Sequence, residues 1–381
     1  MQKLLLIVVI TAFVVSCSWS QTLTNTNLPI FVVTTPQGVS IGDDPRIIAH
    51  LGVIYNGTNV NHNINDPFNN YDGNIAIEIR GSTSQQYPKK GYGFETQDVL
   101  GNNAQVGLCG LPPENDWILY GPYPDKTLIR NVLTYHLFEE MGHYAPRTHY
   151  CELVIDGDYR GVYVLMERIK IDDFRLTLQD VSSPNIFNDT LTGGYVLKVD
   201  KLTGEVGHTW ESLYDNEVLF QFHDPEFDEL NSMQASYMED YIGQMEQAIQ
   251  GPGMDLPAGQ GGWRDFIDYQ SFHDFFIMQE LGRTVDGYRS SSFLYKDKDY
   301  SWNALIKAGP MWDFNLSYGN ADYCLAETTT GWQYNFDLVC DFSTSIPFWW
   351  ERLLDSPAYR NALRCRWDEL RQGVLSTSYI N

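Results

Sequence analysis

The sequence predicts an α+β fold, with a sheet-rich N-terminal half and a helical C-terminal half. Up to about residue 200, apolar and polar residues alternate in short runs separated by Gly, Pro, Asn and Asp, as is typical of β-strands. Beyond that point apolar residues recur every three or four positions, which is the period of an α-helix. No repeat or low-complexity linker divides the chain, and strands followed by helices favour an α+β arrangement.

The strands of the first half are expected to be mainly antiparallel. Residues 156–161 read Asp-Gly-Asp-Tyr-Arg-Gly between two β-type runs and are typical of a hairpin turn. The Asn-rich residues 56–70 have the composition of a long surface loop. The predicted strands span residues 29–33, 51–55, 75–79, 92–95, 150–155, 162–166 and 193–199.

Helices dominate the second half, and one precedes it. Asp125 can cap a helix over about residues 126–141, which Gly142 would end. Apolar residues at helical spacing over 235–249 predict an amphipathic helix, whereas residues 263–281 are apolar nearly all round and predict a buried one. Short strands are expected at 292–295 and 304–307, followed by a helical segment over about 347–372.

The N-terminal residues of the chain indicate export. A basic start, an apolar run over 4–15 and small residues up to Ser20 predict a signal peptide over residues 1–20. The run is shorter than the roughly 20 residues that cross a bilayer, so we expect no transmembrane span. Cys17 also fits a lipobox, which would give a lipid anchor instead of a free secreted protein. Residues 376–381 are expected to begin a linker or a truncated tail.

Charge and cysteine content restrict the partners and the covalent links. The formal net charge of −24 argues against nucleic acid as a partner, because a phosphate backbone attracts basic surfaces. Without Cys17 five cysteines remain, so at most two disulfides can form in an oxidising compartment. Cys324 with Cys340 is the preferred pair, but spacing alone does not fix the connectivity. No cysteine pair has the C-x-x-C spacing of a structural zinc site.

Four groups of residues stand out in the chain: I-R-G-S-T-S (79–84) with Y-P-K-K (87–90), D-K-T-L-I-R-N (125–131), G-V-Y-V-L-M-E (161–167), and V-D-G-Y-R (285–289) with G-P-M-W-D-F-N (309–315) and G-N (319–320). Together these segments resemble the CotH (spore coat protein H) kinase family, over the chain from about Leu28 to the C-terminus. This resemblance implies a distant relative of the protein kinase fold over residues 21–375. It would have two lobes that divide at about residue 200, would bind ATP with Mg²⁺ or Mn²⁺, and would phosphorylate a protein substrate.

The resemblance implies that acidic residues of the last segments bind the metal ion and orient the acceptor hydroxyl. Asp313 is expected to bind the metal, and Asn315 and Asn320 are further candidate metal ligands. Asp286 would orient or deprotonate the acceptor hydroxyl. No His-Arg precedes Asp286, and Ser291 stands where kinases usually have a metal-binding Asn, so the division of roles among these residues stays open.

Further candidates would bind the nucleotide or support catalysis. Lys90 is preferred over its neighbour Lys89 for the phosphates, and strand alternation places the two on opposite faces. Each candidate also has a structural interpretation: a surface lysine, a salt bridge, a buried ion pair or a core aromatic. The remaining candidates are Arg289 as a catalytic group with Asp286, Arg130 or Glu139 on the first helix and Glu167 for the nucleotide, and Tyr163 and Trp312 for stacking on adenine.

Two other classes of function compete with a kinase. A non-catalytic surface adhesin on the same fold is the alternative within the family, because some members act as adhesins or invasins. A glycoside hydrolase needs two carboxylates facing one sugar ring, whereas the adjacent pairs 139–140 and 172–173 diverge. Serine hydrolase, zinc protease and P-loop motifs do not occur in the sequence.

Overall fold

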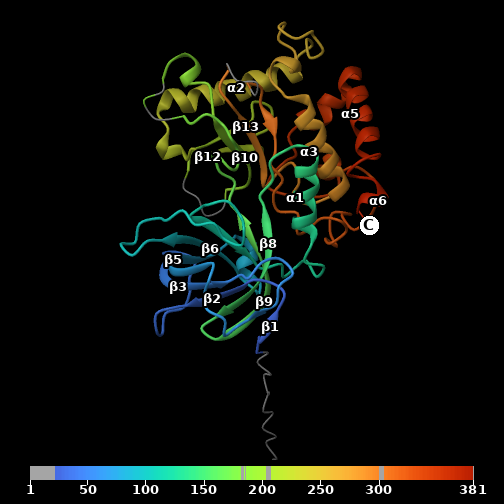
Figure 1. Ribbon diagram of the computed structural model, residues 1–381. Helices are drawn as coiled ribbons and strands as arrows, with labels where there is room; N and C mark the ends of the chain where they lie inside the picture. The colour runs from blue at the N-terminus through green and yellow to red at the C-terminus, as the bar shows by residue number, and fades with distance from the viewer. Residues whose placement is uncertain (1–21, 182–183, 185, 203–206, 300–303, 381) are drawn as a thin grey trace, which may run out of the picture.

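Seven strands close into a barrel, which forms the lower half of the molecule in Figure 1. The structure is a computed structural model and describes residues 22–181, 184, 186–202, 207–299 and 304–380. The barrel order is β2-β3-β5-β6-β7-β9-β8, and it closes where β2 runs parallel to β8. Its strands are β2 (Ile30–Thr34), β3 (Ile47–Ile54), β5 (Tyr71–Arg80), β6 (Gly91–Gln97), β7 (Asp116–Tyr120), β8 (Thr148–Ile155) and β9 (Asp158–Glu167).

Strands β7 and β9 of the barrel pack on both of their faces, which explains their apolar runs. On β7, Trp117 and Leu119 point into the barrel core, whereas Ile118 between them packs outward. Helix α1 (Arg130–Glu140) contributes Tyr135 to the same outer core as Ile118. The outer face of β7 is thereby joined to the helical half of the molecule.

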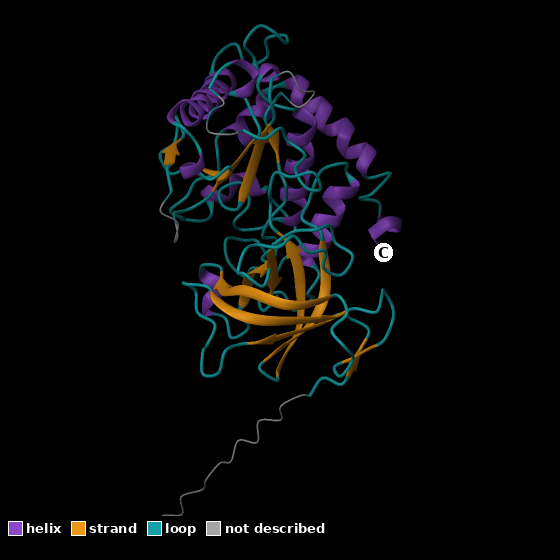
Figure 2. Ribbon diagram, turned by 60° about the vertical axis from the view of Figure 1, so that its left-hand side comes forward, coloured by secondary structure: helices purple, strands orange, loops and turns teal. Residues whose placement is uncertain are grey.

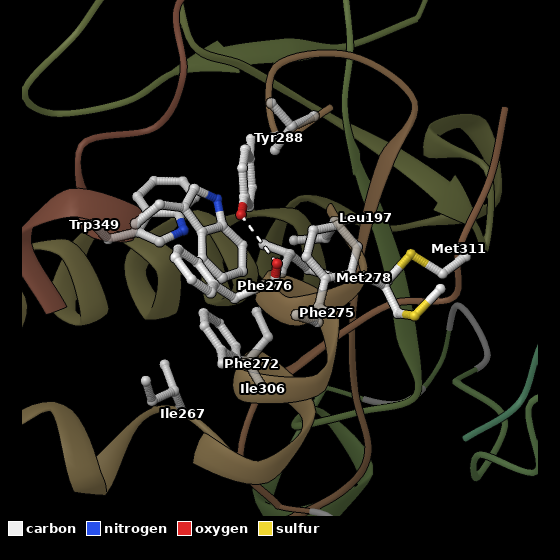
Figure 3. Close-up of a cluster of buried hydrophobic side chains, with 14 of the residues drawn as sticks. Leu197, Ile267, Phe272, Phe275, Phe276, Met278, Tyr288, Ile306, Met311 and Trp349 are labelled. Carbon is white, nitrogen blue, oxygen red and sulfur yellow. Dashed lines mark hydrogen bonds between the residues drawn. The ribbon is translucent and has the colours of Figure 1, made fainter. Parts of the chain in front are cut away.

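A second sheet lies inside the helical half, as Figures 1 and 2 show. One face of this sheet contributes Leu197 and Leu294 to the core that holds Phe275. Figure 3 shows Leu197 among the aromatic side chains of this core. The strand order is β11 (Thr209–Glu211), β12 (Leu219–Asp224), β10 (Tyr195–Val199), β13 (Ser292–Lys296) and β14 (Lys307–Ala308).

Three of the helices begin where a side chain caps free backbone N–H groups. Asn231 accepts hydrogen bonds from the backbone N–H groups of Met233 and Gln234, and Asp268 accepts one from Ser271. Ser356, followed by proline, caps the last long helix. The helices after α1 are α2 (Ser232–Gln250), α3 (Tyr269–Gly282), α4 (Trp349–Arg352), α5 (Pro357–Leu370) and α6 (Thr377–Ile380).

The predicted α+β class is confirmed, while several predicted boundaries are wrong. Helix α1 starts at Arg130 and not at 126, because Leu128 has a left-handed backbone (φ 65°) that interrupts the first turn. Helix α3 starts at Tyr269, since residues 263–265 form a separate 3₁₀ turn before the Asp268 cap. The segment predicted over 347–372 is divided at Ser356, where a new cap begins α5.

Smaller differences concern turns and loops. The β8–β9 hairpin turns at Asp156 and Gly157 alone, both left-handed (φ 51° and 79°), and not over the six residues 156–161. The predicted strand over 304–307 is β14 at 307–308. The Asn-rich segment contains β4 (His62–Asn63), which pairs with β1 (Asn25–Thr26).

Two features concern covalent links and membranes. Cys324 is bonded to Cys340, as expected, whereas Cys109, Cys151 and Cys365 are free thiols. In the part of the chain that the structure describes, no helix has both the length and the apolar character that a membrane crossing requires. The predicted signal peptide and the candidate lipid anchor at Cys17 lie outside the described residues.

Candidate functional site

Three loop segments meet at one end of the five-stranded sheet. β10 ends at Val199, which pairs with Ser292, the first residue of the antiparallel strand β13. β14 is also antiparallel to β13 and ends at Ala308, opposite Leu294. The segments after β10, before β13 and after β14 therefore leave the sheet at the same edge. They contain, respectively, Asp200, Asp286 and Asp313.

The backbone holds Asp313 in a defined and unusual position. Met311 and Phe314 on either side are fully buried, and Met311 packs into the core that contains α3 (Figure 3). Asp313 itself has a left-handed backbone (φ 59°), which is unfavourable for a residue with a side chain. Its backbone N–H donates to the hydroxyl oxygen of Tyr135 on α1 at 3.1 Å. The carboxylate is thereby fixed relative to both α1 and α3.

The three carboxylates are close enough to influence one another. Burial, followed by the negative charges of Asp286 and Asp200, raises the pKa of Asp313 to about 7. Burial also raises the pKa of Asp200 and of Asp286, and the positive charge of Lys201 opposes both shifts. Such mutual repulsion among carboxylates is relieved by a bound cation, so this cluster is a candidate cation site.

Basic side chains face the carboxylates from the barrel and from β10. Burial and the charge of Arg168 lower the pKa of Arg80 to about 10, while Asp313 opposes this shift. Burial lowers the pKa of His223 to about 3, and Arg168, Lys198 and Arg80 contribute in that order. These three cations therefore gather around His223, in a protein whose net charge is −24. Clustered cations beside carboxylates are suited to bind phosphate together with a metal.

Asn315 and Asn320 belong to the loop that holds Asp313. The Nδ2 of Asn315 donates to Oδ1 of Asp313 at 2.6 Å. The Nδ2 of Asn320 donates to the backbone oxygens of Asn315 at 2.7 Å and Pro124 at 3.1 Å. Asn315 is therefore adjacent to the carboxylate cluster, whereas the amide nitrogen of Asn320 ties this loop to the segment before α1.

The donor set suits a hard metal ion shared with a phosphate ligand. Within the described ranges, no three His, Cys, Asp or Glu side chains converge tightly enough to form a complete metal site. Mg²⁺ commonly takes one or two carboxylates from the protein and fills its shell with water and substrate phosphates. Asp313, with the amide of Asn315 next to it and excess negative charge around it, fits that pattern.

Arg289 lies close to Asp286 but its guanidinium is occupied. The side chain is 1% exposed, and its Nε donates to the backbone oxygen of Val285 at 2.9 Å. Its Nη1 is 3.2 Å from the carboxylate of Asp337, and the guanidinium stacks 3.9 Å from the ring centroid of Phe342. These contacts make Arg289 a residue that positions the Asp286 turn.

Arg130 and Glu167 form ion pairs outside the carboxylate cluster. Arg130 pairs with Asp125, and its Nε donates to the backbone oxygen of Ser317 at 2.9 Å. Glu167 is fully buried between Arg147 at 2.9 Å and Arg175 at 3.0 Å. Arg130 therefore joins α1 to the loop after Asp313. Glu139, the alternative to Arg130, is exposed near the end of α1.

The two candidate lysines have different surroundings. The Nζ of Lys90 donates to the backbone oxygen of Gln85 at 2.5 Å. The Nζ of Lys89 donates to the backbone oxygen of Arg160 at 2.9 Å and lies 4.3 Å from the ring centroid of Tyr163. Burial lowers the pKa of Lys89 to about 8.

The two candidate stacking residues also differ. Tyr163 is 1% exposed inside the barrel, where Lys89 covers its ring. Trp312 precedes Asp313, is partly exposed, and lies nearly parallel to Tyr135 with ring centroids 6.1 Å apart. Of these two aromatic rings, Trp312 is the one next to the carboxylate cluster.

Sequence reasoning did not name several residues that the fold brings to this site. The residues without a predicted role are Asp200, Lys198, Lys201, Arg80 and Arg168. The first three lie at or just after the end of β10, outside the family segments. Arg80 lies within the segment 79–84 and Arg168 directly follows the segment 161–167, but neither was given a role. One local signal was available: the run Lys-Val-Asp-Lys at 198–201 ends an otherwise apolar strand. Strand alternation places Lys198 and Asp200 on the same face.

Comparison with known proteins agrees with the resemblance to the CotH kinase family and gives the residues over which the chain matches that family. The family model for the CotH kinase protein matches residues 77–381, which begins inside β5 and includes every residue of the carboxylate and cation clusters. No curated protein matches the chain. Because the match covers most of the sequence and the whole candidate site, the chain belongs to the CotH kinase family.

Proposed function

We propose that this chain is an exported atypical protein kinase that transfers the γ-phosphate of ATP to hydroxyl groups of proteins with the help of Mg²⁺ or Mn²⁺. The observation that carries the proposal is the approach of Asp286, Asp313 and Asp200 to one another beside the basic residues Arg80 and Lys198. Phosphoryl transfer requires this combination: carboxylates for metal and hydroxyl, and cations for phosphate oxygens.

The roles follow from position and chemistry. Asp313, with Asn315 beside it, would hold the divalent ion, which neutralises phosphate charge when it is bound. Asp286 would accept a hydrogen bond from the acceptor hydroxyl and take its proton. Arg80, Arg168 and Lys198 would bind phosphate oxygens.

The barrel half and the helical half would act as the two lobes of a kinase-like enzyme. Arg80 comes from barrel strand β5 and Asp313 from the loop after β14, so both halves contribute to the cluster. Trp312, whose ring already faces Arg80 and Tyr135, would lie beside the adenine base of the bound nucleotide. We further propose export through residues 1–20, to a secreted form or to a lipid-anchored form at Cys17.

The test is phosphate transfer by the purified chain. The wild-type protein is incubated with ATP, Mg²⁺ and dephosphorylated casein, and transferred phosphate is measured by mass spectrometry and with γ-labelled ATP. Asp313→Asn and Asp286→Asn should each lower the rate by about 100-fold or more. The matched control is Asp240→Asn, because Asp240 is exposed on α2 and lies outside the cluster. Circular dichroism checks that all variants fold.

Equal transfer by all four proteins would exclude the proposed roles of Asp313 and Asp286. A wild-type protein that neither binds ATP nor transfers phosphate with either metal would contradict the kinase proposal. That result would favour the family's other function, a surface adhesin without catalysis.

A further inference from the structure

Tyr323 lies in the segment between Asp313 and the disulfide, and its position is constrained from two sides. The next residue, Cys324, is bonded to Cys340. The ring of Tyr323 packs against Phe342, with ring centroids 6.5 Å apart. The residue is 43% exposed, so it lies at the surface of the molecule although its ring is held in place.

Phe342 connects Tyr323 to the turn that contains Asp286. The guanidinium of Arg289 lies 3.9 Å from the ring centroid of Phe342. Arg289 in turn is fixed on the Asp286 turn, where the backbone N–H of Ser290 donates to the oxygen of Asp286 at 2.9 Å. Tyr323 is therefore linked to the Asp286 turn through Phe342 and the buried Arg289.

Electrostatics agree with this proximity. Burial, followed by the charge of Asp286, raises the pKa of Tyr323 to about 12. The charge of Arg289 acts in the opposite direction. The phenol of Tyr323 and the carboxylate of Asp286 thus lie within range of each other's charge.

Three other hydroxyl groups near the carboxylates are buried. The hydroxyl of Tyr120 is buried, and that of Tyr135 lies in the core, where it accepts the backbone N–H of Asp313. Ser290, on the Asp286 turn, is 7% exposed. Tyr323 differs from these three because its ring lies at the surface of the molecule.

We propose that Tyr323 is a phosphate acceptor within the chain itself, so that the enzyme modifies its own Tyr323 in cis. This inference rests on the proposed kinase function. In the step, the Oη of Tyr323 forms a bond to the γ-phosphorus of ATP, and the bond from that phosphorus to the β–γ bridging oxygen breaks. ADP leaves, and the phenolic proton passes to Asp286 and then to water.

The phosphorylated side chain would lie in a mixed electrostatic environment. Phosphotyrosine carries a charge of about −1.5 to −2 at neutral pH. Asp322 and Asp286 would repel that charge, whereas the guanidinium of Arg289 would attract it. Because Arg289 is already paired with Asp337, the new phosphate would compete for that arginine.

The experiment uses the whole purified chain with ATP and Mg²⁺, and it locates phosphate by peptide mass spectrometry after reduction of the disulfide. Phosphate is expected on Tyr323, and Tyr323→Phe and Asp286→Asn should each reduce the signal at this position by at least ten-fold. The fraction modified per minute should not change over a ten-fold range of protein concentration, as a reaction in cis requires.

The matched control is Tyr269→Phe. Tyr269 is also exposed, but it begins α3, whereas Asp286 follows the end of that helix. At 1.5 Å per residue, the helix separates the two by roughly 20 Å. This variant should keep the wild-type signal at Tyr323.

The outcomes separate the inference from the kinase proposal. Phosphate on casein or on other residues, with none on Tyr323, would overturn the inference while leaving the kinase function intact. A rate at Tyr323 that rises in proportion to protein concentration would overturn modification in cis. The absence of phosphate on every residue and on casein would overturn the kinase function, and the inference with it.

Discussion

The guanidinium of Arg80 lies 5.8 Å from the ring centroid of Trp312. Arg80 is the last residue of barrel strand β5, and Trp312 precedes Asp313 in the helical half. A single cation–π contact thus reaches from the barrel to the loop that carries the candidate metal ligand. It places a positive charge beside the carboxylate cluster, where Asp313 acts on the pKa of Arg80.

Arg80→Met should weaken nucleotide binding. Loss of one charge-assisted contact to phosphate corresponds to about 1.5–3 kcal/mol, or on the order of ten-fold to a hundred-fold in dissociation constant. Calorimetric titration with a non-hydrolysable ATP analogue and Mg²⁺ measures this change. The control is Arg46→Met, because Arg46 is a barrel arginine whose charge is paired with Glu78 and Glu95. If the two variants bind the ATP analogue with equal affinity, Arg80 does not contact the phosphates.

Lys89→Met should increase stability at pH 7. Burial lowers the pKa of Lys89 to about 8, below its value in the unfolded chain, so its charged form destabilises the folded state. This penalty is fully present below pH 8 and disappears as pH rises toward 10. Methionine loses the hydrogen bond to Arg160 but avoids the penalty, so we expect a net gain of about 1 kcal/mol in the free energy of unfolding at pH 7.

Urea unfolding at pH 7 and pH 10 measures the effect of Lys89→Met. Lys90→Met is the control, because Lys90 is the neighbouring lysine and bonds to a different backbone oxygen. Lys90→Met should show no gain at either pH. A Lys89→Met protein that is less stable than the wild type at pH 7 would contradict this prediction.

His223→Gln should reduce the sensitivity of the fold to acid. Burial lowers the pKa of His223 to about 3, so the unfolded chain binds a proton at this residue between about pH 6.5 and pH 3 and the folded chain does not. The wild type therefore loses stability as pH falls through this range, by at most about 2 kcal/mol between pH 7 and pH 5 from this residue. Glutamine keeps a donor for the backbone oxygen of Ile169 and has no such titration.

Thermal unfolding of the His223→Gln protein from pH 7 to pH 5 checks this effect. The difference in melting temperature between wild type and variant should narrow, or change sign, on acidification. His208→Gln serves as the control, because His208 is a partly exposed residue just before β11 that pairs with Glu239. A constant difference for His223→Gln across this range would show that His223 is not kept neutral.

Removal of the disulfide should destabilise the segment that carries Tyr323. The bond joins cysteines 16 residues apart, and closing a loop of this length stabilises a folded chain by roughly 3 kcal/mol. Cys324→Ser/Cys340→Ser should lower the free energy of unfolding by about this amount, measured with urea. A reducing agent should bring the wild type to the level of the double variant and leave the variant unchanged.

Local sequence patterns predicted the positions of strands and helices. The way in which the strands pair depends on contacts between distant residues, which local patterns do not show. The alternation at Ile75, Ile77 and Ile79 identified β5, because every second side chain enters the barrel core. The closure of the barrel depends on the pairing of Ile30 with Glu152, and no local pattern relates residues so far apart. The Ser-Pro pair at 356–357 is a local signal for the start of a helix, and the prediction of one continuous helical segment over 347–372 did not take it into account.

In the candidate site too, local sequence patterns predicted some residues, and others depend on how the strands pair. Asp286 and Asp313 were named from their resemblance to family segments, and the strand order brings them together. Asp200 was not named, because its proximity depends on β10 lying next to β13 in the sheet. Charged residues at strand ends are usually solvated, so only the sheet order distinguishes Asp200 from many other carboxylates of this acidic chain.

The closure of the barrel by β2 and β8 has a practical consequence for the N-terminal boundary. The match to the family model begins at residue 77, but β2 and β3 precede that residue and are two of the strands of the barrel. A protein truncated at residue 77 would expose β8 along the side where β2 now pairs, and open edges of this kind recruit strands from other molecules. Residues 30–54 therefore belong to the cooperative folding unit, and recombinant fragments that omit them should self-associate.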